Sequence, residues 1–160
     1  MSKQILLSLA LLSMLVAGNA NSEDREHDAI LTLMDQAFDA VGSSDPDDMR
    51  AIQLAEGTSL SFRPHPDGEP GELEMRMATN EALAAASGDG DHQYMERWLG
   101  EPAVMVHGPV AVVWGEYEFW IDGEFSHCGI DAVDLVKVDD DWKIANWMWT
   151  VEVDNCPATH

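Results

Sequence analysis

The apolar residues that follow the first twenty positions recur at helical spacing and predict an amphipathic helix over residues 23–41. Four of them lie three or four positions apart and therefore share one helix face: Ile30, Met34, Phe38 and Val41. A glycine directly after this pattern is a typical helix end. The segment is therefore expected to bury one face against the rest of the protein.

Two shorter helices are indicated by their capping residues. The Ser44-Asp45-Pro46 run is a typical helix start, and it precedes a short helix that is expected to end near Leu54. Thr79 is expected to cap another helix over residues 79–86. A short strand is predicted between these two helices, at residues 59–63.

From His92 onward, apolar and polar residues alternate and predict one strand after another. Turn sequences rich in Gly, Pro and Asp separate five predicted strands, at residues 92–99, 103–107, 110–121, 125–138 and 142–153. Helices followed by such a series of hairpins are typical of an α+β domain. We expect the three helices to pack on one face of a curved antiparallel sheet.

Hairpin geometry predicts which strand residues share a face of this sheet. Three-residue loops at residues 121–123 and 139–141 would give these opposed pairs: Phe119–Phe125, Tyr117–His127, Leu135–Ala145, Val133–Trp147 and Asp131–Trp149. The odd-numbered residues then form one mostly apolar face, which is expected to line a cavity beneath the helices. The polar residues expected to face away are Glu116, Glu118 and Asp134. A register shift of one residue would reverse the two faces.

Three polar residues fall on the apolar face and are the candidates for catalysis: Tyr117, His127 and Asp131. Asp131 could act as a general base, with Tyr117 donating a hydrogen bond to a developing oxyanion and His127 transferring a proton. The same residues could instead satisfy each other or the nearby backbone, as buried polar groups on strands usually do. A buried carboxylate is costly, which keeps a functional role for Asp131 open.

The candidates for ligand contact are Trp147, Trp149, Phe119 and Arg97. Aromatic residues on strands also build cores and dimer surfaces, and Arg97 could form an ordinary salt bridge. The sequence has no metal-ligand spacing, Gly-rich phosphate loop or nucleophile elbow. Neither a metal nor a cofactor is therefore predicted.

The first twenty residues have the pattern of a cleaved signal peptide. Lys3 provides the positive start, residues 5–17 are an apolar run, and Gly18-Asn19-Ala20 offers small residues for cleavage. The apolar run is shorter than the roughly 20 residues of a membrane-spanning helix. We therefore expect a secreted or periplasmic protein that folds as a single domain of residues 21–160.

The charge balance argues against two classes of partner. The chain has 30 acidic and 8 basic residues, and loss of Lys3 with the signal peptide would change the net charge from −22 to −23. Such a surface repels phosphate backbones and anionic lipids, so neither nucleic acid nor a membrane is an expected partner. A solubility adaptation to salty surroundings is the simplest explanation of the acidity. An apolar content of 46% and six tryptophans argue against disorder.

Two cysteines, Cys128 and Cys156, stand near the two ends of the last predicted hairpin. In an exported chain, two cysteines most often form one disulfide. A catalytic or metal-binding thiol is the alternative, although no Cys-x-x-Cys spacing supports it.

The most specific pattern lies in the last sixty or so residues. Its elements are Arg97, the strand 108–114, Tyr117, Asp122-Gly123, residues 126–129, Leu135, residues 142–144, Thr150 and Cys156. They resemble positions in a group of exported bacterial proteins of the nuclear transport factor 2-like (SnoaL-like) superfamily, a group also described as lumazine-binding. The resemblance covers roughly residues 25–156.

This resemblance implies a cone-shaped, cystatin-like domain that encloses a pocket and forms a homodimer, and it implies no agreed activity. The Tyr and two-Asp set of ketosteroid isomerases and the Asp-Arg-Asp set of limonene-epoxide hydrolases do not map onto this sequence residue by residue. Three functions stay open. The first is binding of a small apolar or aromatic ligand, the second is cofactor-independent acid/base catalysis (isomerase, dehydratase or hydrolase), and the third is a dimeric accessory module without a ligand.

Overall fold

Three helices and seven strands make up the described part of the computed structural model, which covers residues 4–87, 90–154 and 156–157, with side chains from residue 22 onward. The helices are α1 (Gln4–Ser43), α2 (Pro46–Ile52) and α3 (Asn80–Ala86). The strands are β1 (Gln53–Pro64), β2 (Leu73–Thr79), β3 (Tyr94–Trp98), β4 (Ala103–His107), β5 (Val110–Ile121), β6 (Glu124–Val138) and β7 (Asp141–Thr150). The predicted α+β class is confirmed.

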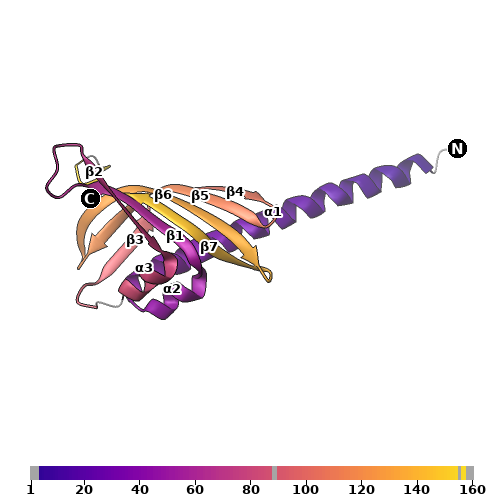
Figure 1. Ribbon diagram of the computed structural model, residues 1–160. Coiled ribbons are helices and arrows are strands. Elements are labelled where there is room, and N and C mark those ends of the chain that lie inside the picture. The colour runs from indigo at the N-terminus through magenta and orange to yellow at the C-terminus, as the bar shows by residue number, and fades with distance from the viewer. Residues whose placement is uncertain (1–3, 88–89, 155, 158–160) are drawn as a thin grey trace.

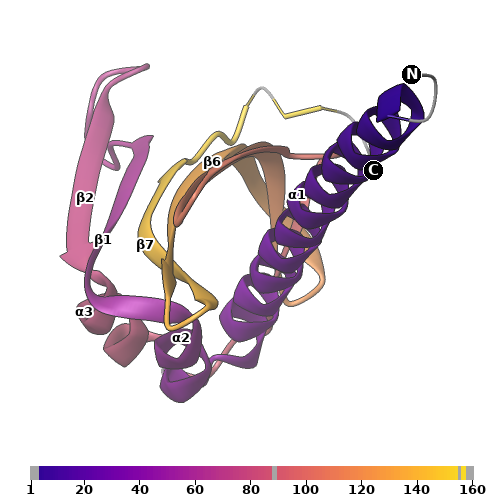
Figure 2. The same ribbon diagram turned by 90° about the vertical axis from the view of Figure 1, so that its right-hand side faces the viewer.

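The strands form one strongly bent sheet in the order β2-β1-β7-β6-β5-β3, with β4 also paired to β5. The sheet curls around an interior, and α1 lies across its open side (Figure 2). The sheet is mixed, because β1 runs parallel to β7 while the other pairs are antiparallel. The expectation of a wholly antiparallel sheet is therefore corrected. β1 enters from α2 at the end of the sheet where β7 also begins, so the two strands run in the same direction.

The hairpin between β5 and β6 has a two-residue loop, not the predicted three-residue loop. Asp122 and Gly123 both have positive φ, 54° and 80°, as such tight turns require. A bulge at Ser126 follows, and the observed pairs are Trp120–Phe125, Phe119–His127 and Tyr117–Gly129. Phe125 therefore lies against Trp120 instead of Phe119, and the expectation that Phe125 shares the inner face is wrong. Beyond the bulge, the odd-numbered residues of both strands share a face, as predicted.

The hairpin between β6 and β7 repeats this arrangement. Asp139 and Asp140 form a two-residue loop with φ of 51° and 72°, and Ala145 bulges out of β7. Leu135 consequently pairs with Ile144 instead of Ala145. Beyond the bulge, two predicted pairs are confirmed: Val133–Trp147 and Asp131–Trp149. The bulge also changes which positions of β7 face inward. The even-numbered residues Trp142 and Ile144 are buried before the bulge, and the odd-numbered Trp147 is buried after it.

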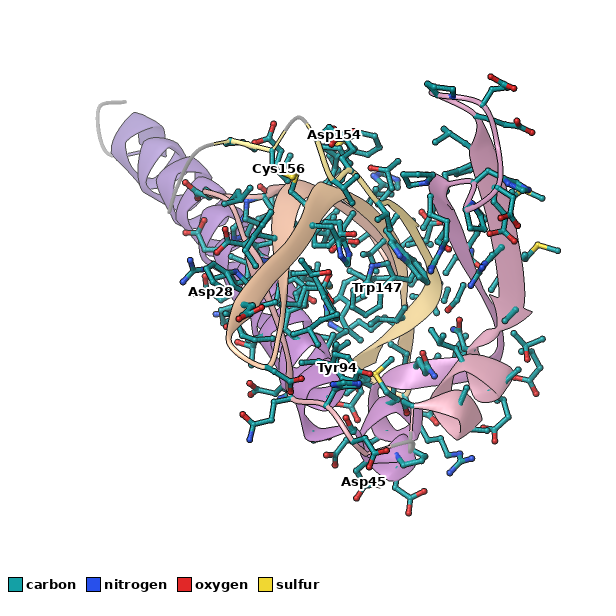
Figure 3. All side chains as sticks on the ribbon, turned by 90° about the vertical axis from the view of Figure 1, so that its left-hand side faces the viewer. Asp28, Asp45, Tyr94, Trp147, Asp154 and Cys156 are labelled. Carbon is teal, nitrogen blue, oxygen red and sulfur yellow. A yellow bond between two sulfur atoms is a disulfide. The ribbon has the colours of Figure 1, made fainter. Side chains whose placement is uncertain are left out.

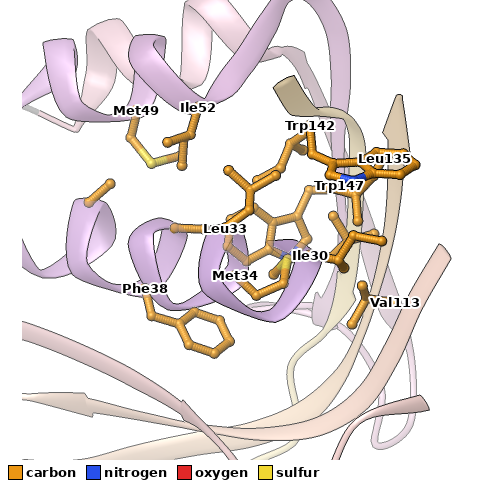
Figure 4. Packing of buried hydrophobic residues seen from close by; sticks show 14 of the residues in the cluster. Ile30, Leu33, Met34, Phe38, Met49, Ile52, Val113, Leu135, Trp142 and Trp147 are labelled. Atoms are coloured by element: carbon orange, nitrogen blue, oxygen red, sulfur yellow. The ribbon is translucent and has the colours of Figure 1, made fainter. Parts of the chain in front are cut away.

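The core lies between α1 and the inner face of the sheet. The apolar face of α1 supplies Ile30, Leu33, Met34 and Phe38, which pack against strand residues in Figure 4. The buried strand residues facing them include Val113, Val133, Leu135, Ile144 and Trp147. Burial of this stripe stabilises the helix on the sheet, at roughly 1.5–3 kcal/mol for each large side chain.

An ion cluster fixes the start of the packed part of α1. Lys137 Nζ lies 2.7 Å from Glu26 Oε1, and Trp142 Nε1 donates to Glu26 Oε2 at 2.8 Å. The preceding part of α1, over the predicted signal peptide, projects away from the sheet (Figure 1). Lys3 lies outside the described residues. Among the residues that are described, no helix combines the length and apolar character needed to cross a membrane.

The predicted disulfide between Cys128 and Cys156 is present, with a Cα–Cα distance of 5.7 Å. It ties the chain end to β6, where Cys128 and Glu152 also exchange two backbone hydrogen bonds of 3.0 and 2.8 Å. Disulfides persist in oxidising compartments, so this bond is consistent with a protein that functions outside the cytoplasm.

Candidate functional site

A cavity of about 550 Å³ lies inside the bend of the sheet, within the size range of small-molecule sites. The side chain of Trp147 points into this space in Figure 3. The helices contribute only uncharged residues to the wall: Val41, Met49, Leu83 and Ala86. Polar groups enter the cavity mainly from the strands, and they are few.

Six of the seven residues predicted to catalyse or bind line this cavity: Tyr117, His127, Asp131, Phe119, Trp147 and Trp149. Glu116 and Asp134 are exposed and do not line it. The predicted inner face is therefore the cavity face along β5, β6 and the second half of β7. The structure brings the candidates together, while their roles remain predictions.

Arg97, the seventh residue, faces the other way. Its Nε forms an ion pair with the fully buried carboxylate of Glu118, its direct cross-strand partner. The guanidinium also lies 5.7 Å from the ring centroid of Trp120. Arg97 is absent from the cavity wall, so the geometry does not support the expected ligand contact, and the alternative of an ordinary salt bridge describes it. Glu118 is buried by its neighbours on this outer side and does not line the cavity.

The central feature of the cavity is a pair of carboxyl groups. Asp131 is completely buried, and its Oδ1 accepts a hydrogen bond from Trp147 Nε1 at 2.9 Å. The side chain of Glu96 reaches the cavity from β3 and lies close enough to Asp131 for each carboxyl group to shift the pKa of the other. Asp131 Oδ2 has no hydrogen-bond partner among the described residues. Two neighbouring carboxyl groups in an apolar cavity disfavour carrying two negative charges, so the pair favours keeping one proton.

Burial and mutual repulsion explain why the pair keeps its proton. Burial raises the pKa of Asp131 to about 7, against lowering contributions from the Trp147 hydrogen bond and from the neighbouring Glu96. Burial, followed by the nearby charge of Asp131, raises the pKa of Glu96 well above its usual range. At neutral pH the cavity therefore contains both a proton donor and a carboxylate.

Tyr117 is held by the backbone. Its hydroxyl donates to the carbonyl oxygen of Thr150 at 2.8 Å, and only 1% of the residue is exposed. Gly129 makes room for this contact, because a Cβ there would lie 2.0 Å from Thr150 O and 2.9 Å from Tyr117 Cε1. Burial, then the charges of Asp131 and Glu96, raise the pKa of Tyr117. Its one proton is already donated, which favours the structural alternative over the expected oxyanion donor.

His127 is part of an aromatic wall. Its ring stacks on Phe119 at 4.9 Å between centroids, and Phe119 in turn lies 5.8 Å from Tyr94. Burial, with a smaller contribution from the positive charge of Arg63, lowers the pKa of His127 to about 4. The imidazole is therefore neutral at physiological pH and does not supply an acid there. A hydrogen bond joins its Nδ1 to Ser126 Oγ at 3.0 Å.

Glu96 and Arg63 line the cavity, and sequence reasoning missed both. A signal for Glu96 existed in the alternation of Tyr94, Glu96 and Trp98, which places a carboxylate between two inward-facing aromatic residues. Little in the sequence indicated that Arg63 lines the cavity, because its strand was expected to be short and the pairing of that strand with β7 was not foreseen. Each residue lies on a strand with a neighbour that is distant in the sequence: β5 for the strand of Glu96 and β7 for the strand of Arg63.

The comparisons with known proteins establish the fold. No protein-family model and no curated protein match the sequence. A nuclear transport factor 2-like superfamily protein from Salmonella enterica is similar in structure, with a TM-score of 0.60 and 14% identity over 82% of this chain and 94% of that one. A protein of unknown function with a cystatin-like fold from Nostoc punctiforme has a TM-score of 0.59 and 10% identity, over 78% and 90%.

A third similar structure, from Novosphingobium aromaticivorans, is provisionally named a scytalone dehydratase. Its TM-score is 0.63 and its identity is 14%, over 84% of this chain and 89% of that one. At such low identity these likenesses concern the fold alone. The chain has the cone-shaped nuclear transport factor 2-like fold, as its sequence pattern predicted.

Proposed function

We propose that this protein of the nuclear transport factor 2-like fold binds one small, mostly apolar, ring-containing molecule in its cavity. The observation that carries the proposal is the cavity itself, with a volume of about 550 Å³ and a wall built chiefly from aromatic and aliphatic side chains. Tyr94, Phe119 and His127 form a continuous aromatic surface along one side. Flat apolar walls with few polar groups suit an apolar ring.

Native mass spectrometry of protein purified from its source organism tests this proposal directly. We expect a retained small molecule, and we expect the neutral dye N-phenyl-1-naphthylamine to bind the emptied cavity with increased fluorescence. Ala86→Trp should weaken dye binding at least about fivefold, because Ala86 lines the cavity and a large side chain there obstructs it. Ala85→Trp is the matched control, since Ala85 is exposed on the same helix and does not line the cavity. A wild-type protein that neither retains a molecule nor binds the dye would contradict the proposal.

Acid/base catalysis without a cofactor is the second candidate, and the carboxyl pair favours it. Glu96 and Asp131 offer a neutral acid beside a carboxylate inside an apolar cavity, which is a common arrangement for moving a proton between two substrate atoms. If the bound molecule is a substrate, Glu96→Gln should abolish its turnover and leave its binding largely intact. Turnover that is unchanged in Glu96→Gln would exclude the pair from the reaction.

We also propose that two copies associate through the outer face of the sheet. Met105, Trp114 and Met148 are 63%, 52% and 44% exposed. The pairing of β4, β5, β6 and β7 sets them on one surface. Trp114→Glu should convert a dimer into a monomer in size-exclusion chromatography with light scattering. Ala85→Glu, at an exposed position on α3 away from the sheet face, should leave the mass unchanged. A wild-type monomer at high concentration would contradict the proposal.

A further inference from the structure

Arg63 differs from most cations of the described structure. Several others form ion pairs with carboxylates: Arg50 with Asp47 and Glu81, Arg76 with Glu74, Arg97 with Glu118, and Lys137 with Glu26. Arg63 lines the cavity, and no carboxylate of the described residues lies within ion-pair distance of it. In a chain with 30 acidic residues, an unpaired arginine in a largely apolar wall is unexpected.

The guanidinium of Arg63 also has unused hydrogen-bonding capacity. Its Nη2 donates to Ser61 Oγ at 3.2 Å, whereas its Nε is buried and has no partner. A buried N–H without an acceptor costs free energy, which a bound acceptor would recover. The edge of a guanidinium is suited to a planar oxyanion, because two parallel N–H groups can donate to two oxygens.

Arg63 lies near the end of β1, beside the end of β7. Phe62, its neighbour on β1, accepts a backbone hydrogen bond from Val151 at 2.8 Å, just beyond the end of β7. The charge of Arg63 lowers the pKa of His127 and opposes the rise in that of Tyr117. Arg63 lies on β1, whereas Asp131 lies on β6 and Glu96 on β3, and neither of these strands neighbours β1 in the sheet. The arginine and the carboxyl pair therefore act at separate places in the cavity.

We propose that Arg63 binds an anionic group of the ligand, so that the ligand is an apolar ring compound with a single negative charge, such as a ring carboxylate. This inference rests on the proposed ligand-binding function and names the chemical class of the ligand. The charged end lies at Arg63, and the ring extends along the aromatic wall toward Asp131 and Glu96. A single charge fits better than a double one, because the carboxyl pair and the acidic surface repel added negative charge.

Two dyes with one ring system test the inference. Anilinonaphthalene sulfonate carries one negative charge, and N-phenyl-1-naphthylamine is the same structure without the sulfonate. We expect the wild type to bind the charged dye more tightly than the neutral one. Arg63→Gln should weaken binding of the charged dye about tenfold, the usual effect of losing a charge-assisted hydrogen bond, and change binding of the neutral dye less than about twofold. Arg25→Gln removes an exposed cation on α1 that does not line the cavity, and it should change neither affinity.

The outcomes separate the inference from the proposed function. If both dyes bind equally well, and Arg63→Gln weakens the binding of neither dye, the inference of an anionic ligand is wrong while the proposed binding function stands. If neither dye binds the wild type, the binding function itself fails. Should Arg63→Gln not fold, Arg63→Lys keeps the charge and loses the paired N–H groups, and it should still weaken binding of the charged dye.

Competition distinguishes the kinds of anion. Displacement of the charged dye by 2-naphthoate, 2-naphthyl phosphate and the neutral 2-naphthylmethanol is measured on the wild type. We expect 2-naphthoate to compete best and 2-naphthylmethanol worst. If the phosphate competes clearly best, the inference that the ligand carries a single negative charge is wrong. If the alcohol competes best, the proposed role of Arg63 is wrong.

Discussion

Asp131→Asn is expected to raise the free energy of unfolding by about 1–3 kcal/mol at pH 8, because the wild type must ionise the fully buried carboxyl group of Asp131 beside Glu96. The asparagine oxygen can still accept the hydrogen bond from Trp147 Nε1, and its amide can donate to Glu96. The substitution keeps nearly the same volume and removes one buried ionisable group. Functional sites often lower the stability of a protein, so a substitution that raises stability here would indicate that the carboxyl pair is kept for function.

The size of this gain should depend on pH. The unfolded chain loses its carboxyl protons near pH 4, whereas the raised pKa of about 7 for Asp131 keeps the proton on the folded pair at higher pH. Between these values the unfolded state binds fewer protons, so the stability of the wild type falls as the pH rises. The part of the cost that comes from Asp131 is complete above about pH 7 and absent below about pH 4. The advantage of Asp131→Asn should therefore be larger at pH 8 than at pH 5.

The groups that face the pair are Trp147 from β7, Tyr117 from β5 and, farther along the cavity, His127 and Arg63. Urea unfolding at the two pH values measures the effect, with Asp134→Asn as the control. Asp134 is exposed on the same strand as Asp131, so its substitution should change stability little at either pH. Loss of stability in Asp131→Asn at pH 8 would show that the pair is not a destabilising element.

Removing the disulfide should have a comparably large effect in the opposite direction. The double variant Cys128→Ala/Cys156→Ala is expected to lose roughly 2–4 kcal/mol, because the bond closes a loop between residues 28 positions apart and limits the unfolded chain. The tail would then be held to β6 chiefly by the two backbone hydrogen bonds between Cys128 and Glu152. Urea unfolding of the variant and the wild type measures the difference.

Reduction of the wild type with dithiothreitol provides the control for this prediction. The reduced wild type should unfold at the same urea concentration as the double variant, since both lack the cross-link. Added reductant should not change the variant. Equal stability of the oxidised wild type and the double variant would contradict a stabilising role for the bond.

The sequence allowed the helices, the late hairpins and most of the cavity face to be predicted, because these depend on local periodicity and turn residues. β2 was missed, since its large apolar residues Met75 and Met77 are exposed and resemble no buried pattern. The parallel pairing of β1 with β7 was missed because it joins segments more than eighty positions apart. Such pairings are decided by packing of the whole sheet and not by local preference.

The candidate site was predicted only in part for the same reason. Asp131 was expected in the cavity from its own hairpin, whereas its partner Glu96 comes from β3, two strands away in the sheet. Tyr117 was expected to be available for chemistry, but its hydroxyl is bound to Thr150, whose backbone position follows from β7. The sequence could locate single polar residues on a face, while their partners depended on the order of the strands.

The bulge at Ala145 also constrains how the gene can change. Ile144 and Trp147 both face inward only because one extra residue lies between two alternating stretches, the first serving the core and the second the cavity. Loss of a single codon there would turn one of the two stretches outward. We therefore expect evolution to tolerate insertions and deletions in the turn at Asp139 and Asp140 more readily than in this part of the strand. A relative with a gap at this point would have to build its core or its cavity from other residues.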